Sequence, residues 1–206
     1  MAVPADALTT RQKVKDYLSI SGSDYDTVID NLITYVTSFI KGFCGGRNFL
    51  AADYIEYKES IRGRRIIFCN QRPVNSITKV EYRSGTPLAP VWVEYNGNGW
   101  LPYLPQGYIK FYSQLPTISQ GFRVTYNAGY LIDFANEFDN TKHTLPAEIT
   151  LVATELVAKE YNTRKAIGIF SESTEGQTIN YSSKSRELDD NHKNILASYK
   201  LYRIAK

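Results

Sequence analysis

The sequence of 206 residues is poor in the residue types that carry covalent or metal chemistry, with only two cysteines and two histidines. Cys44 and Cys69 give neither a disulfide framework nor a CxxC pair, which excludes a small disulfide-stapled secreted domain. We expect both thiols to be buried apolar side chains of a protein made in a reducing compartment.

Long apolar runs and a strong charge imbalance are also absent from the sequence. No segment approaches the ~20 apolar residues that span a bilayer. Residues 1–10 lack the basic and apolar regions of a secretory signal, so we expect synthesis in the cytosol. The net charge of +3 is spread along the chain and does not require a nucleic-acid or membrane partner.

Apolar and aromatic residues, by contrast, are plentiful. The hydrophobic fraction of 43% and charged fraction of 22% are those of a globular protein that buries a core. The 16 tyrosines fit both sheets and interfaces, where a large ring and a hydroxyl are useful together. The length suits one large domain or one domain with an insertion.

The N-terminal part of the chain is predicted to form two helices. Residues 9–12, TTRQ, have the spacing of a capping box, and the short helix that follows should stop near Ser21-Gly22. Asp24 and Asp26 place negative charge where a second helix begins. That helix, of about five turns, should end at Gly45-Gly46. Its apolar positions recur every three or four residues: Val28, Ile29, Leu32, Ile33, Val36, Phe39, Ile40 and Phe43.

Two further helices are predicted near the C-terminal end of the sequence. Thr144 and Pro146 suit the start of a third helix, which fades between Lys165 and Gly168. Its apolar face is Ile149, Val152, Ala153, Leu156, Val157 and Tyr161. A last helix should begin at Asp189 or Asp190 and end with basic residues that suit its dipole. Its apolar stripe is Ile195, Leu196, Tyr199 and Tyr202.

Residues 53–127 differ from their surroundings because short β-branched and aromatic segments alternate with turn signals. We predict about six strands in a small antiparallel barrel or sandwich. The turn signals are Arg62-Gly63, Arg72-Pro73, Ser84-Gly85, Asn96 to Gly99 and Gln120-Gly121. The predicted fold is therefore α+β. A helical base of about four helices, residues 1–52 with 128–206, carries an inserted β domain and ends in an extended segment and helix.

Motifs for catalysis or metal binding are weak in this sequence. Asp189, Asp190 and His192 are possible metal ligands, but no HExxH or similar spacing supports them, and a helix N-terminus explains them. No histidine has a spacing that ties it to Cys44 as a catalytic base. The glycines match neither a Walker motif nor GxGxxG. We predict no enzymatic activity, no catalytic or metal-binding residues and no cofactor.

An aromatic stretch in the β region is the first candidate binding surface. Aromatic rings among Gly and Pro can stack sugars or bases, or contact another protein. They can equally be folded over the β core. A ligand- or carbohydrate-binding module is therefore the alternative function. The residues concerned are Trp92, Tyr95, Trp100 and Tyr103, with Tyr108 nearby.

The C-terminal region is the second candidate surface. Residues 168–182, GIFSESTEGQTINYS, are rich in Ser, Thr and Gly but include scattered apolar side chains. The segment is either a hairpin packed on its own subunit or an element that folds on binding. The last helix either folds back on the helical core or is presented to a partner groove. Both alternatives are open.

Four segments in a fixed order carry a family resemblance. They are LTTRQKVKDYLSISGSDYDTVIDNLITYVTSFIKGFCGGRNF (8–49), RPVNSITKVEYRSG (72–85), FRVTYNAGY (122–130) and LPAEITLVATELVAKEYNTRKAIGIFSES (145–173). Together they resemble the adaptor proteins of tailed-phage head-to-tail connectors, including members with a β-insert between the second and third helices. The likeness covers most of residues 8–175, and the insert of about 75 residues departs from the short members.

The resemblance implies a structural virion protein without enzymatic activity. Such adaptors form a homo-oligomeric ring, usually of twelve copies, beneath the portal vertex. They extend the DNA channel, join the capsid portal to a tail or stopper protein, and allow transient non-specific DNA passage. We therefore expect location in the virion neck, and in the host cytoplasm during assembly, with no membrane contact.

The resemblance also implies that the region after the third helix contacts the portal or a neighbouring subunit. We expect the isolated subunit to be monomeric or weakly associated, with residues 168–206 mobile until assembly. The expected contact residues are Ile169, Phe170, Ile179, Tyr181, Ile195, Leu196, Tyr199, Tyr202 and Arg203.

Overall fold

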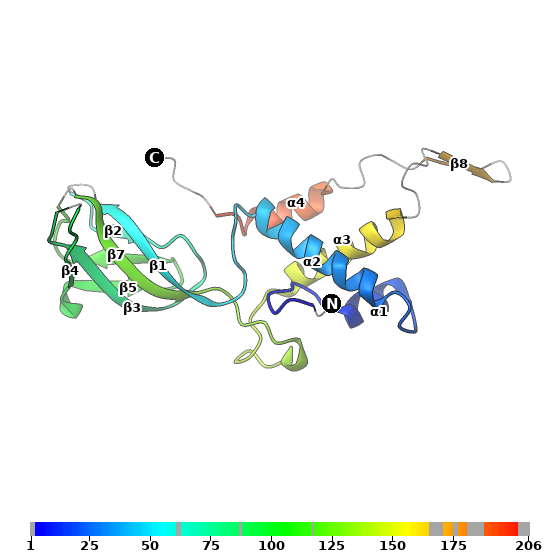
Figure 1. Cartoon of the computed structure of the whole chain (residues 1–206), viewed down its shortest axis with the longest axis horizontal. Helices are drawn as coiled ribbons and strands as arrows, with labels where there is room; N and C mark the ends of the chain where they lie inside the picture. Colours follow the sequence, from blue (N-terminus) through cyan, green and yellow to red (C-terminus); the bar gives the residue numbers. More distant parts are fainter. Residues whose placement is uncertain are drawn as a thin grey trace. The chain divides into compact units, whose positions relative to one another are not determined.

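A computed structural model describes residues 3–60, 63–86, 88–116, 118–164, 171–174, 177–180 and 188–201. The chain divides into two compact units, which we call the helical unit and the β unit (Figure 1). The helical unit combines Met1–Arg47 with Ile132–Lys200, and the β unit is built on Asn48–Leu131. In the part of the chain that is described, no helix is long and apolar enough to cross a membrane.

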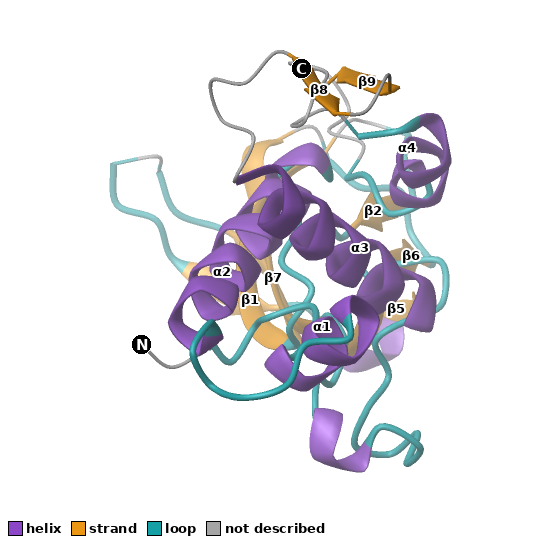
Figure 2. Cartoon of the chain, turned by 90° about the vertical axis from the view of Figure 1, so that its right-hand side faces the viewer, coloured by secondary structure: helices purple, strands orange, loops and turns teal. Residues whose placement is uncertain are grey.

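The helical unit consists of α1 (Arg11–Leu18), α2 (Asp26–Phe43), α3 (Ala147–Thr163) and α4 (Asp190–Ala197). Helices α1, α2 and α3 pack together, as Figure 2 shows. The predicted apolar face of α3 is confirmed, because all its members are buried. The core of this unit includes Leu8, Val14, Ile29, Ile33, Val36, Ile40, Ile149, Val152, Ala153 and Val157.

The predicted start of the first helix is wrong by one residue. The N-cap is Thr10, whose hydroxyl accepts a hydrogen bond from the Lys13 amide at 3.3 Å. Thr9 is instead buried, with its hydroxyl 2.7 Å from that of Thr154 on α3. Of the two neighbouring threonines, Thr10 caps α1 and Thr9 joins the start of α1 to α3.

Asp26 does not cap α2 through its side chain, which also differs from the prediction. Its carboxylate forms ion pairs with Arg11 and Lys15 of α1, and the hydrogen bond from Lys15 is the main cause of its lowered pKa. Arg11 also reaches the buried Asp30 with two hydrogen bonds, at 2.8 and 2.5 Å. The carboxylates of Asp26 and Asp30 therefore hold α1 against α2, and no side chain caps the start of α2.

The other helix ends follow the sequence more closely. Helix α2 ends before Gly45 and Gly46, which both have positive φ, as predicted. Asp189 caps α4 by accepting from the His192 amide at 2.8 Å, also as predicted. The N-cap of α3 is Pro146 rather than Thr144, and α4 ends at Ala197, before the residues expected to extend it.

The β unit is an open sandwich of two antiparallel sheets rather than a closed barrel, with one strand more than expected in the described residues. One sheet has the order β1-β7-β3-β4 and the other β2-β6-β5. The strands are β1 (Ala52–Ser60), β2 (Ile66–Phe68), β3 (Val74–Arg83), β4 (Trp92–Glu94), β5 (Trp100–Tyr103), β6 (Tyr108–Phe111) and β7 (Ile118–Ala128). Side chains between the sheets form its core, including Ile67, Val80, Ile109, Phe111, Phe122, Val124 and Tyr126.

The chain enters and leaves the β unit at one place. Strands β1 and β7 pair from Ala52 with Ala128 onward, and before them the Ala51 amide donates to the Tyr130 carbonyl at 2.8 Å. Gly129 lies between these contacts with φ of +116°, and a Cβ there would come within 2.7 Å of the Leu50 carbonyl oxygen. Only glycine fits this crossing without displacing backbone.

Gln120-Gly121, predicted as a turn, lies inside strand β7. Gln120 has φ of +47°, and the register against β1 shifts between Lys58 and Ser60. Strand β7 therefore contains a bulge, with extra residues opposite β1, and the strand continues through it. Local turn chemistry is the same in a bulge and a turn, which explains the error.

The outer face of the four-stranded sheet contains a nearly buried carboxylate. Glu81 is 3% exposed and accepts two hydrogen bonds from Arg123, at 2.6 and 2.7 Å. Lys79 lies 3.0 Å away on the same side. The Arg123 hydrogen bonds are the main reason that the pKa of Glu81 falls from 4.5 to about 2.

Because the folded-state pKa of Glu81 is depressed, its contribution to stability is present above pH 4.5 and is lost as the pH falls toward 2. We expect Glu81→Gln to lower the unfolding free energy of the β unit by about 2 kcal/mol at pH 7. The difference from wild type should shrink through that pH window. Urea unfolding followed by tryptophan fluorescence measures it, because both tryptophans lie in this unit. The exposed Glu59 supplies the control, and equal effects of Glu59→Gln and Glu81→Gln would refute the assignment.

Candidate assembly surface

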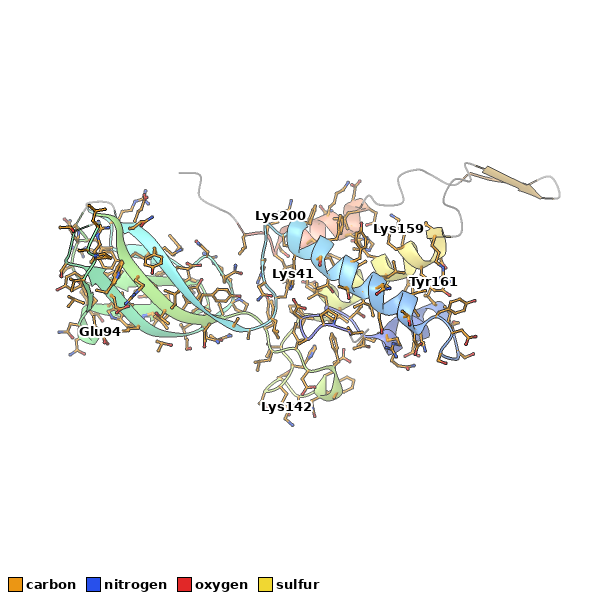
Figure 3. All side chains as sticks on the ribbon, viewed as in Figure 1. Lys41, Glu94, Lys142, Lys159, Tyr161 and Lys200 are labelled. Carbon is orange, nitrogen blue, oxygen red and sulfur yellow. The ribbon has the colours of Figure 1, made fainter. Side chains whose placement is uncertain are left out.

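Helix α4 is docked on the C-terminal end of α2 in the single chain. Leu196 is completely buried, and its carbonyl oxygen lies 3.8 Å from the Cys44 sulfur. The Arg47 guanidinium donates to the Tyr199 carbonyl at 2.8 Å and lies 5.3 Å from the centre of the Tyr199 ring. The Lys200 ammonium is 4.1 Å from the centre of the Phe43 ring, and Figure 3 labels Lys200 near this end of α2. Of the two predicted arrangements, the structure has the helix folded back on the core.

Polar contacts join α4 to α3 as well. His192 is buried, with Nε2 2.7 Å from a Glu155 carboxylate oxygen and Nδ1 3.0 Å from Asp189. The Tyr199 hydroxyl donates to the carboxylate of Glu148. His192 therefore connects the two helices through its ring, and its amide donates to the N-cap Asp189.

The residues weighed as metal ligands do not converge on one point. His192 faces Glu155, whereas the exposed Asp190 pairs with Lys193 at 3.1 Å. Within the described ranges, no group of three or more His, Cys, Asp or Glu side chains is arranged to hold a metal ion. The geometry at the start of α4 is that of a helix cap and an inter-helix contact.

Cys44, weighed as a nucleophile, is fully buried beneath α4. Burial raises the pKa of its thiol to about 11, against a smaller opposing effect of Arg47. Because the thiolate is the reactive form, Cys44 is inert at neutral pH in this arrangement. Cys69, in the core of the β unit, is similarly buried, and burial raises its pKa to about 12.

Only some of the residues predicted to contact a portal or neighbouring subunit belong to the described part of the chain. Ile195 and Tyr199 are half-buried on α4 and the turn after it, and Leu196 is enclosed. Ile179 belongs to strand β9 (Gln177–Asn180), which pairs with β8 (Ser171–Thr174), but its side chain lies outside the described residues. Also outside them are Ile169, Phe170, Tyr181, Tyr202 and Arg203.

The aromatic residues singled out in the β unit are all half-buried. Tyr95 packs edge-on against Phe111, with ring centres 5.2 Å apart, and Trp100 packs against the same core. Trp92 lies under the Arg123 guanidinium at 4.9 Å, and Tyr103 stacks on Tyr108 at 4.7 Å. Tyr95 and Trp100 therefore cover the core and do not form an open stacking platform.

Comparison with known proteins identifies the family. The model of the family described as "Head completion protein" matches residues 7–202. The chain belongs to the head completion protein family. The resemblance to head-to-tail connector proteins is thus confirmed. A search of curated proteins found no match.

Solved structures with the same fold come from gene transfer agent (GTA) particles. Chains from "Virion of native gene transfer agent (GTA) particle" and "Neck of empty GTA particle computed with C6 symmetry" align with TM-scores of 0.57 and 0.54. A chain from "Neck of native GTA particle computed with C12 symmetry" gives 0.52. All three are 15% identical, the alignments cover 100% of this chain, and they cover 95%, 95% and 94% of those chains.

Several residues of this surface had no visible role in the sequence. Arg47 follows the glycines that end α2, but its partner Tyr199 is 152 positions away. Glu148 and Glu155 belong to α3 but not to its predicted apolar face. No local pattern pairs either residue with α4.

Undocking of α4 can be followed through Cys44. We expect Leu196→Ala to raise the rate at which a thiol reagent labels Cys44 by at least about tenfold, because the lost Leu side chain weakens docking. Mass spectrometry of peptides from the labelled protein resolves the two cysteines. Cys69 is the internal control and should keep its wild-type rate. An unchanged rate at Cys44 would show that α4 does not shield it.

Proposed function

We propose that this head completion protein is a structural adaptor of the virion neck, which forms a ring beneath the portal vertex. In this role it extends the DNA channel and joins the capsid portal to a downstream tail or stopper protein. Its action is assembly and involves no reaction. The observation that carries the proposal is the family match over residues 7–202.

The solved structures of like fold support the same role. Those chains come from necks and virions of GTA particles, with neck reconstructions computed in C6 and C12 symmetry. Both symmetries are compatible with a closed ring of twelve copies. A ring of this kind requires two different surfaces on each subunit, one meeting the other on the neighbour.

The proposed portal contact is the chain after α3. Helix α4 is short, and its hold on the core combines one fully buried apolar side chain, Leu196, with several polar contacts. Such a helix is among the elements that open at low free energy, so it can exchange its contacts for those of a partner. Ile195 of α4 is half-buried, so part of its apolar side chain is open to a partner surface.

We also propose that the two units correspond to a discontinuous connector domain and an insert, with residues 53–127 as the insert. The pairing of Ala52 with Ala128 supports this, because a unit whose ends meet can be added to a loop without separating the flanking helices.

Co-assembly with the portal protein of the same phage tests the function. The purified chain mixed with that portal should give closed rings, coaxial with the portal, in electron micrographs. Absence of any complex at micromolar concentration of both proteins would contradict the function.

A point variant tests the contact by α4. Ile195→Asp should weaken portal binding by at least about tenfold, since it places a charge in an apolar contact. Asn194→Asp, an exposed neighbour with the same added charge, is the matched control and should bind normally. Equal portal binding by both variants would show that α4 does not form the portal contact.

A further inference from the structure

Phe138 is 99% exposed, although the helical unit to which it belongs buries an apolar core. It lies in residues 132–146, between the β unit and α3, which we call the Phe138 loop. A single exposed apolar residue is ordinary, so the exposure of Phe138 carries weight only together with the support and the charge of its loop.

The Phe138 loop is held in place by its own hydrogen bonds. The His143 amide donates to the Asp139 carbonyl at 2.8 Å, and the His143 ring accepts from the Asp133 amide at 3.1 Å. Glu137, next to Phe138, is fixed to Lys13 of α1 at 2.7 Å. Figures 1 and 3 show the loop, marked by Lys142 in Figure 3, extending away from the helices. These contacts hold the backbone around Phe138 in one conformation, in which the phenyl ring is exposed.

The Phe138 loop is also acidic. Asp133, Glu137 and Asp139 outnumber its one cationic side chain, Lys142. The two carboxylates nearest in sequence, Glu137 and Asp139, precede and follow Phe138, and pair with Lys13 and Lys142. The loop therefore combines an apolar tip with negative charge, and a complementary surface would be apolar with positive charge around it.

The outer face of the three-stranded sheet has these properties. We call it the β2–β6–β5 face, and pairing arranges it in two rows across the sheet. One row is Ile66, Lys110 and Leu101, and the other is Phe68, Tyr108 and Tyr103. Ile66, Phe68 and Leu101 are 38%, 44% and 41% exposed. The face thus consists of apolar and aromatic side chains with one lysine at its centre.

Charge around the β2–β6–β5 face has a single sign. Residues 60–80 and 95–122, which contain all three strands, include no Asp or Glu. All five acidic residues of 48–131 lie in the four-stranded sheet instead: Asp53, Glu56, Glu59, Glu81 and Glu94. Arg64 and Arg65 are exposed just before β2. Among the described residues, neither they nor Lys110 has a carboxylate within ion-pair distance.

The outer face of the four-stranded sheet differs in this respect, because it carries charges of both signs and several of its polar side chains pair with each other. Arg123 pairs with Glu81 and covers Trp92, and Asn127 donates to Asp53 at 2.7 Å. The outer face of the four-stranded sheet also exposes Ile55 and Tyr57, at 62% and 55%, but it carries charges of both signs. The β2–β6–β5 face combines apolar area with positive charge alone.

We propose that the Phe138 loop of one copy of this chain docks on the β2–β6–β5 face of the next copy. The phenyl ring lies along the aliphatic stem of Lys110 between Ile66 and Leu101, and the loop carboxylates meet Arg64 and Arg65. The two surfaces are different, so the contact is head-to-tail and repeats around a ring. This inference rests on the proposed function and names the subunit contact that the ring would use.

Disulfide trapping tests the geometry. In the full chain, Phe138→Cys combined with Leu101→Cys should give, under mild oxidation with the portal present, a ladder of covalent multimers beyond the dimer. The trapping variants also carry Cys44→Ala, because release of α4 to the portal would uncover Cys44, whereas Cys69 is buried in the core of the β unit. Each single variant should give no ladder. A product that stops at the dimer would overturn the head-to-tail contact.

Side-chain substitutions give an independent measurement on the same rings. Phe138→Ala and Lys110→Glu should each raise the concentration needed for ring formation by at least about tenfold. Phe138→Lys with Lys110→Glu should recover part of the loss by exchanging the contact for an ion pair. Leu88→Ala, an equally exposed apolar residue, is the control and should change nothing.

The outcomes separate this inference from the function. Rings that form on the portal without cross-linking and tolerate Lys110→Glu would overturn the contact and leave the adaptor role standing. Failure of the wild-type chain to form any ring would contradict the adaptor role, and the contact with it. Salt-sensitive binding of duplex DNA that Lys110→Glu abolishes, with ring formation unchanged, would assign the face to nucleic acid and also overturn the contact.

Discussion

The antiparallel pairing of β1 with β7 is the constraint on which the rest of the structure depends. Helices α2 and α3 must pack together, yet 103 residues separate Phe43 from Ala147 in the chain. Main-chain bonds between Ala51 and Tyr130, and the glycine at position 129, return the chain to where it left. The helical unit can therefore form one core from two distant segments, and the β unit can vary without disturbing it.

A division of roles between surfaces follows from this arrangement. The helical unit offers α4, which is docked through Leu196 and polar contacts to α2 and α3, and the Phe138 loop, which is fixed but uncovered. The β unit has one outer face whose charges are neutralised internally and one that is apolar and basic. An adaptor of the proposed kind needs several independent contact surfaces, and the uneven distribution of charge over this chain is compatible with them.

The sequence predicts those features that depend on neighbouring residues. The apolar face of α3, the glycines after α2 and the cap of α4 repeat local rules and are found where expected. The α2 stripe is confirmed in part, because Ile29, Ile33, Val36 and Ile40 are buried but Val28 is exposed. Errors arise where two local readings share one signal: Thr9 and Thr10 can both cap, and Gln120-Gly121 suits a bulge as well as a turn. Contacts such as Arg47 with Tyr199 or His192 with Glu155 join distant positions, so no local pattern reveals them. The exposure of Phe138 is equally invisible in sequence, because an isolated Phe in a polar loop is usually buried.

The position of the chain in the virion is the central claim, and cryo-electron microscopy of intact particles tests it most directly. The account predicts a closed ring of copies of this fold between the portal and the tail, around the DNA channel. Density for the fold elsewhere in the particle, or a neck without it, would contradict the account.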